Sequence, residues 1–89
     1  MEKDEVLTAS LVEFMSIEEA AFLCRVEEAW LSCRVKEGYF IEREEGFSSH
    51  DLKRAKRMSD VERNFDAAPE LAALVADLLE EIDRLKTRT

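Results

Sequence analysis

The stretch from residue 16 to residue 47 constrains the fold most, because it carries start and stop signals at close spacing. Ser16 followed three residues later by Glu19 forms a capping box, which begins a helix. The next helix opens on two glutamates, whose charge suits the positive end of the helix dipole. Gly38 is the residue type that ends a helix in the left-handed conformation. These signals predict helix, tight turn and helix over residues 16–38.

The residues that follow predict a small β excursion and a third helix. Tyr39, Phe40 and Ile41 favour a strand, a polar tip follows, and the chain returns at Phe47, which is typical of a hairpin over residues 39–47. Residues 49–65 carry one apolar stripe of helical period. A short strand over residues 6–14 leads into the first helix. The order of elements is that of a winged helix-turn-helix in a mainly α domain.

A fourth helix is predicted over residues 69–86, with Pro69 in its first turn. Apolar residues alternate steps of four and three along it, the spacing of a helix-packing seam. They are Leu71, Val75, Leu78, Ile82 and Leu85. This helix is either a core helix of a monomer or one that packs one edge on its own domain and the other on a symmetry mate. We favour the second interpretation, so these residues are the candidate homodimer contacts.

Length and charge narrow the function. The chain has 89 residues, which fits one domain over residues 1–89, with 13 basic against 21 acidic residues and a net charge of −8. Proteins that bind duplex DNA are normally basic, because much of their affinity comes from neutralising phosphates. Nucleic acid is therefore not the expected ligand, and a basic protein partner suits this chain better.

The residues that carry chemistry are sparse. The two cysteines, Cys24 and Cys33, lie nine positions apart, and His50 is the single histidine, so no zinc spacing is present. The two glycines are too far apart for a phosphate-binding loop. We expect no enzyme activity, no cofactor and no metal. No signal peptide and no apolar run of about 20 residues is present, so a cytoplasmic location with reduced thiols is expected, away from the membrane.

Two features are candidates for partner contact. Four glutamates surround the turn between the first two helices: Glu18, Glu19, Glu27 and Glu28. They can serve helix capping, dipole complementation and solubility, or form a docking surface for a basic helix, and both can hold at once. Trp30 is either a core residue or partly exposed on the second helix, where an aromatic side chain makes a good binding hot spot.

The third helix holds the densest basic cluster. Lys53, Lys56 and Arg57 share one face of it. They are either a solvated face paired with glutamates of the predicted wing (Glu42, Glu44 or Glu45) or a phosphate-binding patch. Basic residues without interleaved aromatics or glycines make a poor nucleic-acid signature. The solvated face is the interpretation we favour.

Three segments carry a resemblance to a known family. They are SIEEAAFLCRVEEAWLSCRVKEGYF, FSSHDLKRAKRM and FDAAPELAALVADLLEEIDRLK. Their order resembles a MerR-type winged helix and, more closely, the CbpM-type chaperone-modulator branch, over residues 11–86. The resemblance implies a protein that binds and inhibits the J-domain of a DnaJ-like co-chaperone of the CbpA type and that dimerises through its last helix. The alternative is a MerR-type DNA-binding transcriptional regulator.

Departures from the DNA-binding pattern weaken that alternative. MerR regulators carry an arginine directly after the leucine early in the recognition helix, whereas Leu31 is followed here by Ser32. They also carry an arginine two residues before the aromatic that ends the wing, and Glu45 stands there, before Phe47. Cysteines that sense metals lie on the dimer helix of such regulators, and no cysteine follows Cys33 in this chain.

Overall fold

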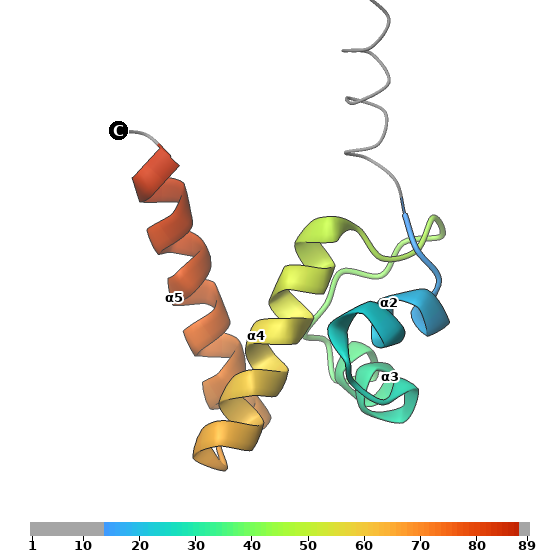
Figure 1. The fold of residues 1–89 in the computed structure, drawn as a ribbon, viewed down its shortest axis with the longest axis horizontal. Helices are drawn as coiled ribbons and strands as arrows, with labels where there is room; N and C mark the ends of the chain where they lie inside the picture. Colours follow the sequence, from blue (N-terminus) through green and yellow to red (C-terminus); the bar gives the residue numbers. More distant parts are fainter. Residues whose placement is uncertain (1–13, 88–89) are drawn as a thin grey trace, which may run out of the picture.

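The computed structural model describes residues 14–87, and within that range it contains four α-helices and no strand. They are α2 (Ile17–Cys24), α3 (Glu28–Lys36), α4 (Ser49–Phe65) and α5 (Pro69–Thr87). α2 and α3 lie together on one side of α4, while α5 leaves the far end of α4 and diverges from it in a V (Figure 1). The predicted mainly α fold is confirmed. The strand predicted over residues 6–14 lies, except for Phe14, outside the described residues.

Local signals place the helix starts. The Ser16 hydroxyl accepts a hydrogen bond from the Glu19 backbone N–H at 3.1 Å, and the Glu19 carboxylate accepts one from the Ser16 N–H at 2.9 Å. Ser48 and Asp51 form the same reciprocal pair at the start of α4. Each capping box gives a side-chain acceptor to two backbone N–H groups that would otherwise stay unpaired at the helix start.

Left-handed residues place the helix ends. Arg25 follows α2 with φ 60°, Gly38 follows α3 with φ 93°, and Asp66 follows α4 with φ 53°. The Arg25 N–H donates to the Phe22 carbonyl at 3.2 Å, which closes the last turn of α2. Of these three residues only Gly38 was predicted to end a helix, because glycine adopts the left-handed conformation without steric cost.

The connection between α3 and α4 differs from the predicted hairpin. The structure assigns no strand to residues 39–47; instead, Phe47 pairs with Met15 in one isolated antiparallel bridge, with two backbone hydrogen bonds of 2.8 Å. Gly46 permits this approach, since a Cβ on it would lie 2.4 Å from the Met15 carbonyl oxygen. The chain returning from the tip therefore pairs with the residue before α2 rather than with residues 39–41.

The core lies where α2, α3 and α4 meet. Leu31 and Met58 are the largest fully buried side chains among the described residues, and Phe40 packs with them, its ring edge-on to Phe47 at 6.4 Å. α2 contributes small residues, Ala20 among them, which bring its backbone close to its neighbours. α5 buries only alanines against this core: Ala72, Ala73 and Ala76.

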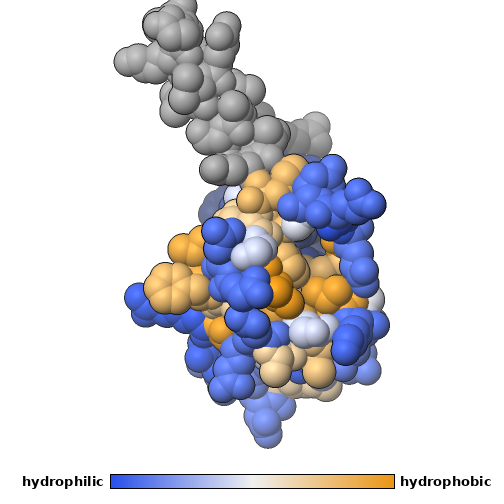
Figure 2. Space-filling model, turned by 90° about the vertical axis from the view of Figure 1, so that its right-hand side faces the viewer, coloured by the Kyte–Doolittle hydropathy of each residue, from blue (hydrophilic) through white to orange (hydrophobic). Residues whose placement is uncertain are grey.

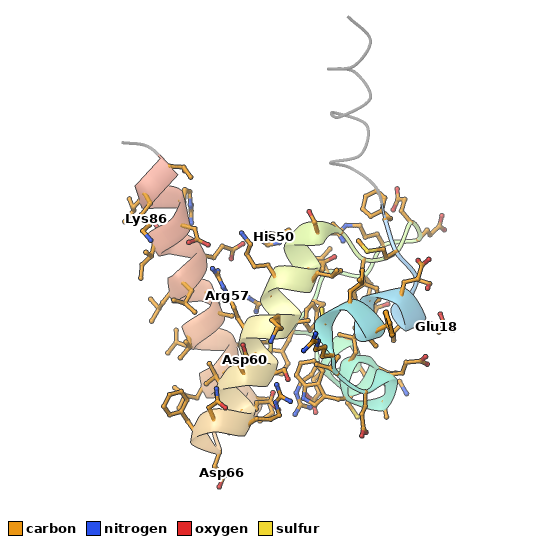
Figure 3. All side chains as sticks on the ribbon, in the orientation of Figure 1. Glu18, His50, Arg57, Asp60, Asp66 and Lys86 are labelled. Atoms are coloured by element: carbon orange, nitrogen blue, oxygen red, sulfur yellow. The ribbon has the colours of Figure 1, made fainter. Side chains whose placement is uncertain are left out.

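Charged side chains bridge the V between α4 and α5. Arg54 pairs with Asp77 at 2.5 Å and Arg57 with Asp83 at 2.7 Å, while Lys53 lies 4.0 Å from Asp83. His50 also contacts Glu80 across the gap. Figure 3 shows His50 and Arg57 on the side of α4 that faces α5. α5 is thus joined to the rest by alanine packing near the turn and by ion pairs beyond it.

Candidate docking surface

The four glutamates singled out from the sequence all lie exposed on α2 or at the start of α3. Glu19 is used by the capping box of α2, so its side chain has a structural role. Glu27 occupies the N-cap position of α3 but makes no capping hydrogen bond with its side chain. Within residues 14–87, Glu18, Glu27 and Glu28 form no ion pair and no side-chain hydrogen bond. Capping therefore accounts for one of the four carboxylates.

Trp30 points into the domain more than toward solvent. Its ring is half-buried against the core, its Nε1–H donates to Glu62 Oε1 at 2.9 Å, and the Arg34 guanidinium lies 5.3 Å from the ring centroid. Its single polar donor is therefore used between α3 and α4. Its exposed edge lines a hollow of about 610 Å³ that Arg25 and Glu27 also line.

Arg34 and Glu62 form the central polar contact between α3 and α4. The guanidinium donates from Nε to Glu62 Oε2 at 2.9 Å and from Nη2 to Oε1 at 2.8 Å, a two-pronged pair that is mostly buried. Hydrogen bonds from Arg34, and then from Trp30, hold the pKa of the Glu62 carboxyl below its ordinary value. The same pair raises the pKa of Arg34. These charges serve the fold and are not free for a ligand.

The basic cluster of α4 is also occupied within the chain. Each of its basic residues lies within ion-pair distance of a carboxylate: Lys53, Arg54, Lys56, Arg57 and Arg63. Their partners lie on α5 or on α4 itself, at Asp77, Asp83 and Asp60. The predicted pairing with wing glutamates is wrong, because the side of α4 that bears Lys53, Arg54 and Arg57 faces α5. A phosphate would have to displace these carboxylates.

The outer face of α2 holds two residues that the sequence interpretation missed. Phe22 is 81% exposed and Leu23 58% exposed. Residues four apart share a helix face, so Glu18 lies beside Phe22 and Glu19 beside Leu23. The opposite face holds Ala20, Ala21 and Cys24, all buried. That division of small and large apolar residues is visible in the sequence and was the signal that could have found them.

The predicted dimer contacts lie along α5. Four of them are about half exposed: Leu71, Leu78, Ile82 and Leu85. The fifth, Val75, is half-buried. Leu74 is about as exposed as the first four and lies in the same row. At about 100° per residue this row lies opposite the buried alanines of α5. The inner edge of α5 is thus made of alanines, and the predicted contacts face outward, with only Val75 half-buried.

Within residues 14–87 no group of three or more His, Cys, Asp or Glu side chains is arranged to hold a metal ion. Cys24 is buried and its thiol contacts the Leu52 carbonyl at 3.4 Å; burial raises the pKa of this thiol. No helix in the described part of the chain has the length and apolar character to cross a membrane.

Comparisons with protein-family models, with curated proteins and with solved structures found no match to this chain.

Proposed function

We propose that this protein is a non-catalytic chaperone modulator that binds and inhibits the J-domain of a DnaJ-like co-chaperone through the acidic surface of α2 and the start of α3. In this proposal α2 and α3 are the helix-turn-helix of a MerR-like winged domain, and residues 39–47 are a minimal wing. The resemblance of the sequence to CbpM-type proteins supports the choice of partner.

One observation carries the proposal: within residues 14–87 most basic side chains pair with carboxylates, Arg25 and Lys36 excepted, whereas three of the four glutamates around the α2–α3 turn form no ion pair and no side-chain hydrogen bond. The basic residues of α4 all pair with carboxylates. Arg34 and Arg43 pair with Glu62 and Asp51. Glu18, Glu27 and Glu28 keep their charge toward solvent among residues 14–87. A surface of this kind attracts a basic helix and repels phosphate.

Inhibition would follow from occlusion. A J-domain presents a basic helix that its Hsp70 partner must reach, and a protein that covers this helix blocks that contact without chemistry. Complementary charge mainly speeds association and selects the partner. The exposed row on α5 would join two copies, so that one dimer presents two acidic surfaces.

The test compares two ligands at low salt. The protein is titrated against a labelled J-domain of the CbpA type and against a duplex DNA of random sequence. We expect saturable binding to the J-domain that weakens as salt rises, and a matching loss of J-domain-stimulated Hsp70 ATPase activity. DNA binding with a steep salt dependence and no J-domain binding would instead favour a DNA-binding regulator.

A further inference from the structure

We infer that the outer face of α2 is the docking site for a basic amphipathic helix, with Phe22 and Leu23 as its apolar centre and Glu18 and Glu19 as its acidic rim. This inference deepens the proposed function and rests on it for the identity of the partner. It adds which residues make contact and what chemistry the partner helix must present: apolar side chains on one face, flanked by lysine or arginine.

Exposure of the two apolar residues is the first observation. Phe22 and Leu23 are adjacent and expose 81% and 58% of their surface. The residues of α2 that do enter the core are small, so turning the helix to bury Phe22 would expose Ala20, Ala21 and Cys24. Leaving a large apolar side chain in water forgoes the favourable free energy of burying it. A partner that covers it recovers that energy.

Charge around the pair is the second observation. Figure 3 shows Glu18 pointing away from the body of the domain, and Figure 2 shows apolar side chains on this side of the molecule with hydrophilic side chains around them. Glu18 forms no ion pair within the described residues, and the free glutamates at the start of α3 lie just beyond the turn. Covering the apolar pair with an acidic surface would bring like charges together, whereas lysine or arginine would neutralise them.

A second copy of this chain is the competing occupant of the α2 face. Two copies that met here would set Glu18 and Glu19 against the same residues of the partner copy, which costs energy in a contact that excludes water. The exposed apolar row lies on a different helix, α5. The α2 face therefore suits a different protein of opposite charge.

A helix suits the geometry of this face. Glu18 stands one turn before Phe22, and Glu19 stands one turn before Leu23, so the four residues form two short parallel ridges along α2. Ridges at this spacing interdigitate with those of another helix. An amphipathic helix contributes side chains at intervals of three and four, which reach both ridges from one face.

The test uses three variants of the full chain: Phe22→Ser, Leu23→Ser and the matched control Phe65→Ser. Phe65 is 75% exposed at the far end of α4. None of the three opens the core, and circular dichroism and melting temperature check this. Two probes are used: the CbpA-type J-domain and a synthetic 18-residue helix of leucine and lysine. With each probe we expect at least about a 10-fold weaker binding for Phe22→Ser, less for Leu23→Ser, and no change for Phe65→Ser.

The two probes separate failure of the inference from failure of the proposed function. If the native chain binds the J-domain and Phe22→Ser binds it equally well, the inference is overturned and the proposed function stands. If the native chain binds only the leucine–lysine helix and loses it on Phe22→Ser, the inference stands and the J-domain is not the partner. Binding to neither probe overturns both. A sedimentation coefficient that falls only in Phe22→Ser would assign the face to a second copy and overturn the inference.

Discussion

The α2–α3 half and the α4–α5 half of the molecule are built in opposite ways. In the first, large buried side chains such as Leu31 hold the helices together, and the charges of Glu18, Glu27 and Glu28 are left toward solvent. In the second, alanines and ion pairs join the helices, and the large apolar residues of α5 face outward. The first half therefore leaves unpaired carboxylates exposed beside Phe22 and Leu23, and the second leaves a row of apolar residues exposed.

The difference teaches which contacts each half still lacks. A helix that shows charge and a few apolar groups suits a partner that can leave again, since charge mainly governs association rate and selectivity. A helix that shows a continuous apolar row suits a lasting contact, such as one with a second copy. Both functions can then reside in one small domain without sharing a surface.

The largest effect is expected where the core is densest. Leu31 is fully buried, so Leu31→Ala should destabilise the domain by about 2–4 kcal/mol, because it removes buried methyl groups and leaves a cavity. Chemical denaturation followed by circular dichroism measures the change. Ile41→Ala, at an exposed position of the connection before α4, is the control and should stay within about 0.5 kcal/mol. Equal losses in both variants would contradict the division of the molecule described above.

The next largest effect is expected on self-association, when the exposed row of α5 is disrupted. Leu78→Glu places a charge at the centre of the row and should weaken self-association by about 30-fold or more. Leu23→Glu makes the same change at a similar exposure, 58% against 55%, on the α2 face. Analytical ultracentrifugation should give monomers for the first variant only. A native chain that sediments as a monomer, or loss of dimers in both variants, would remove α5 as the dimer contact.

Removing the polar contact between α3 and α4 should destabilise the domain less than Leu31→Ala does. Glu62→Gln keeps an oxygen for Trp30 but breaks the two-pronged pair with Arg34, and we expect a loss of about 1–3 kcal/mol. The folded pKa of Glu62 is depressed below 4.5, so its stabilisation is present above about pH 4.5 and is lost as the pH falls through the lower folded pKa. Denaturation from pH 7 to pH 3 should show that the free energies of unfolding of the native protein and of Glu62→Gln converge only below about pH 4.5. A constant difference down to pH 3 would show that the carboxylate charge is not responsible.

Removing one ion pair between α4 and α5 should have the smallest effect on stability. Asp77→Asn removes the pair with Arg54 but leaves the hydrogen bond from Arg54 to the Tyr39 carbonyl. Because Asp77 is exposed, the loss should be under about 1 kcal/mol and should vanish at high salt. Glu44→Gln, which removes a carboxylate that has no ion-pair partner in the described range, is the control. A loss that persists in 1 M salt would point to packing rather than charge.

Local features of the fold could be predicted from the sequence, and distant contacts could not. Capping boxes at Ser16 and Ser48, and Gly38 beyond α3, act within one turn of the chain, so the helix bounds follow from them. The partner of Trp30, by contrast, lies 32 residues away at Glu62, and nothing near Trp30 indicates it. The pairing of Phe47 with Met15 has the same character.

The candidate site was predictable in its charges and not in its centre. The carboxylates around the first turn are exposed as their sequence context predicts, since glutamates at a helix start stay at the surface. Which aromatic residue faces solvent depends on how α2 and α3 rotate against α4. The structure turns Phe22 outward and packs Trp30 against the core, and that choice depends on Met58 and Glu62, far along the chain.

The central claim is that the acidic surface of α2 and α3 binds the J-domain, and two charge-reversal variants of equal net charge test it most directly. Glu27→Lys with Glu28→Lys is compared with Glu70→Lys with Glu81→Lys on α5. Each exchange adds two charges, so both double variants move the net charge from −8 to −4. We predict that the first pair weakens J-domain binding by about 10-fold or more and that the second leaves it within about 2-fold. Equal affinities for the two variants, whether both weakened or both unchanged, would contradict the account.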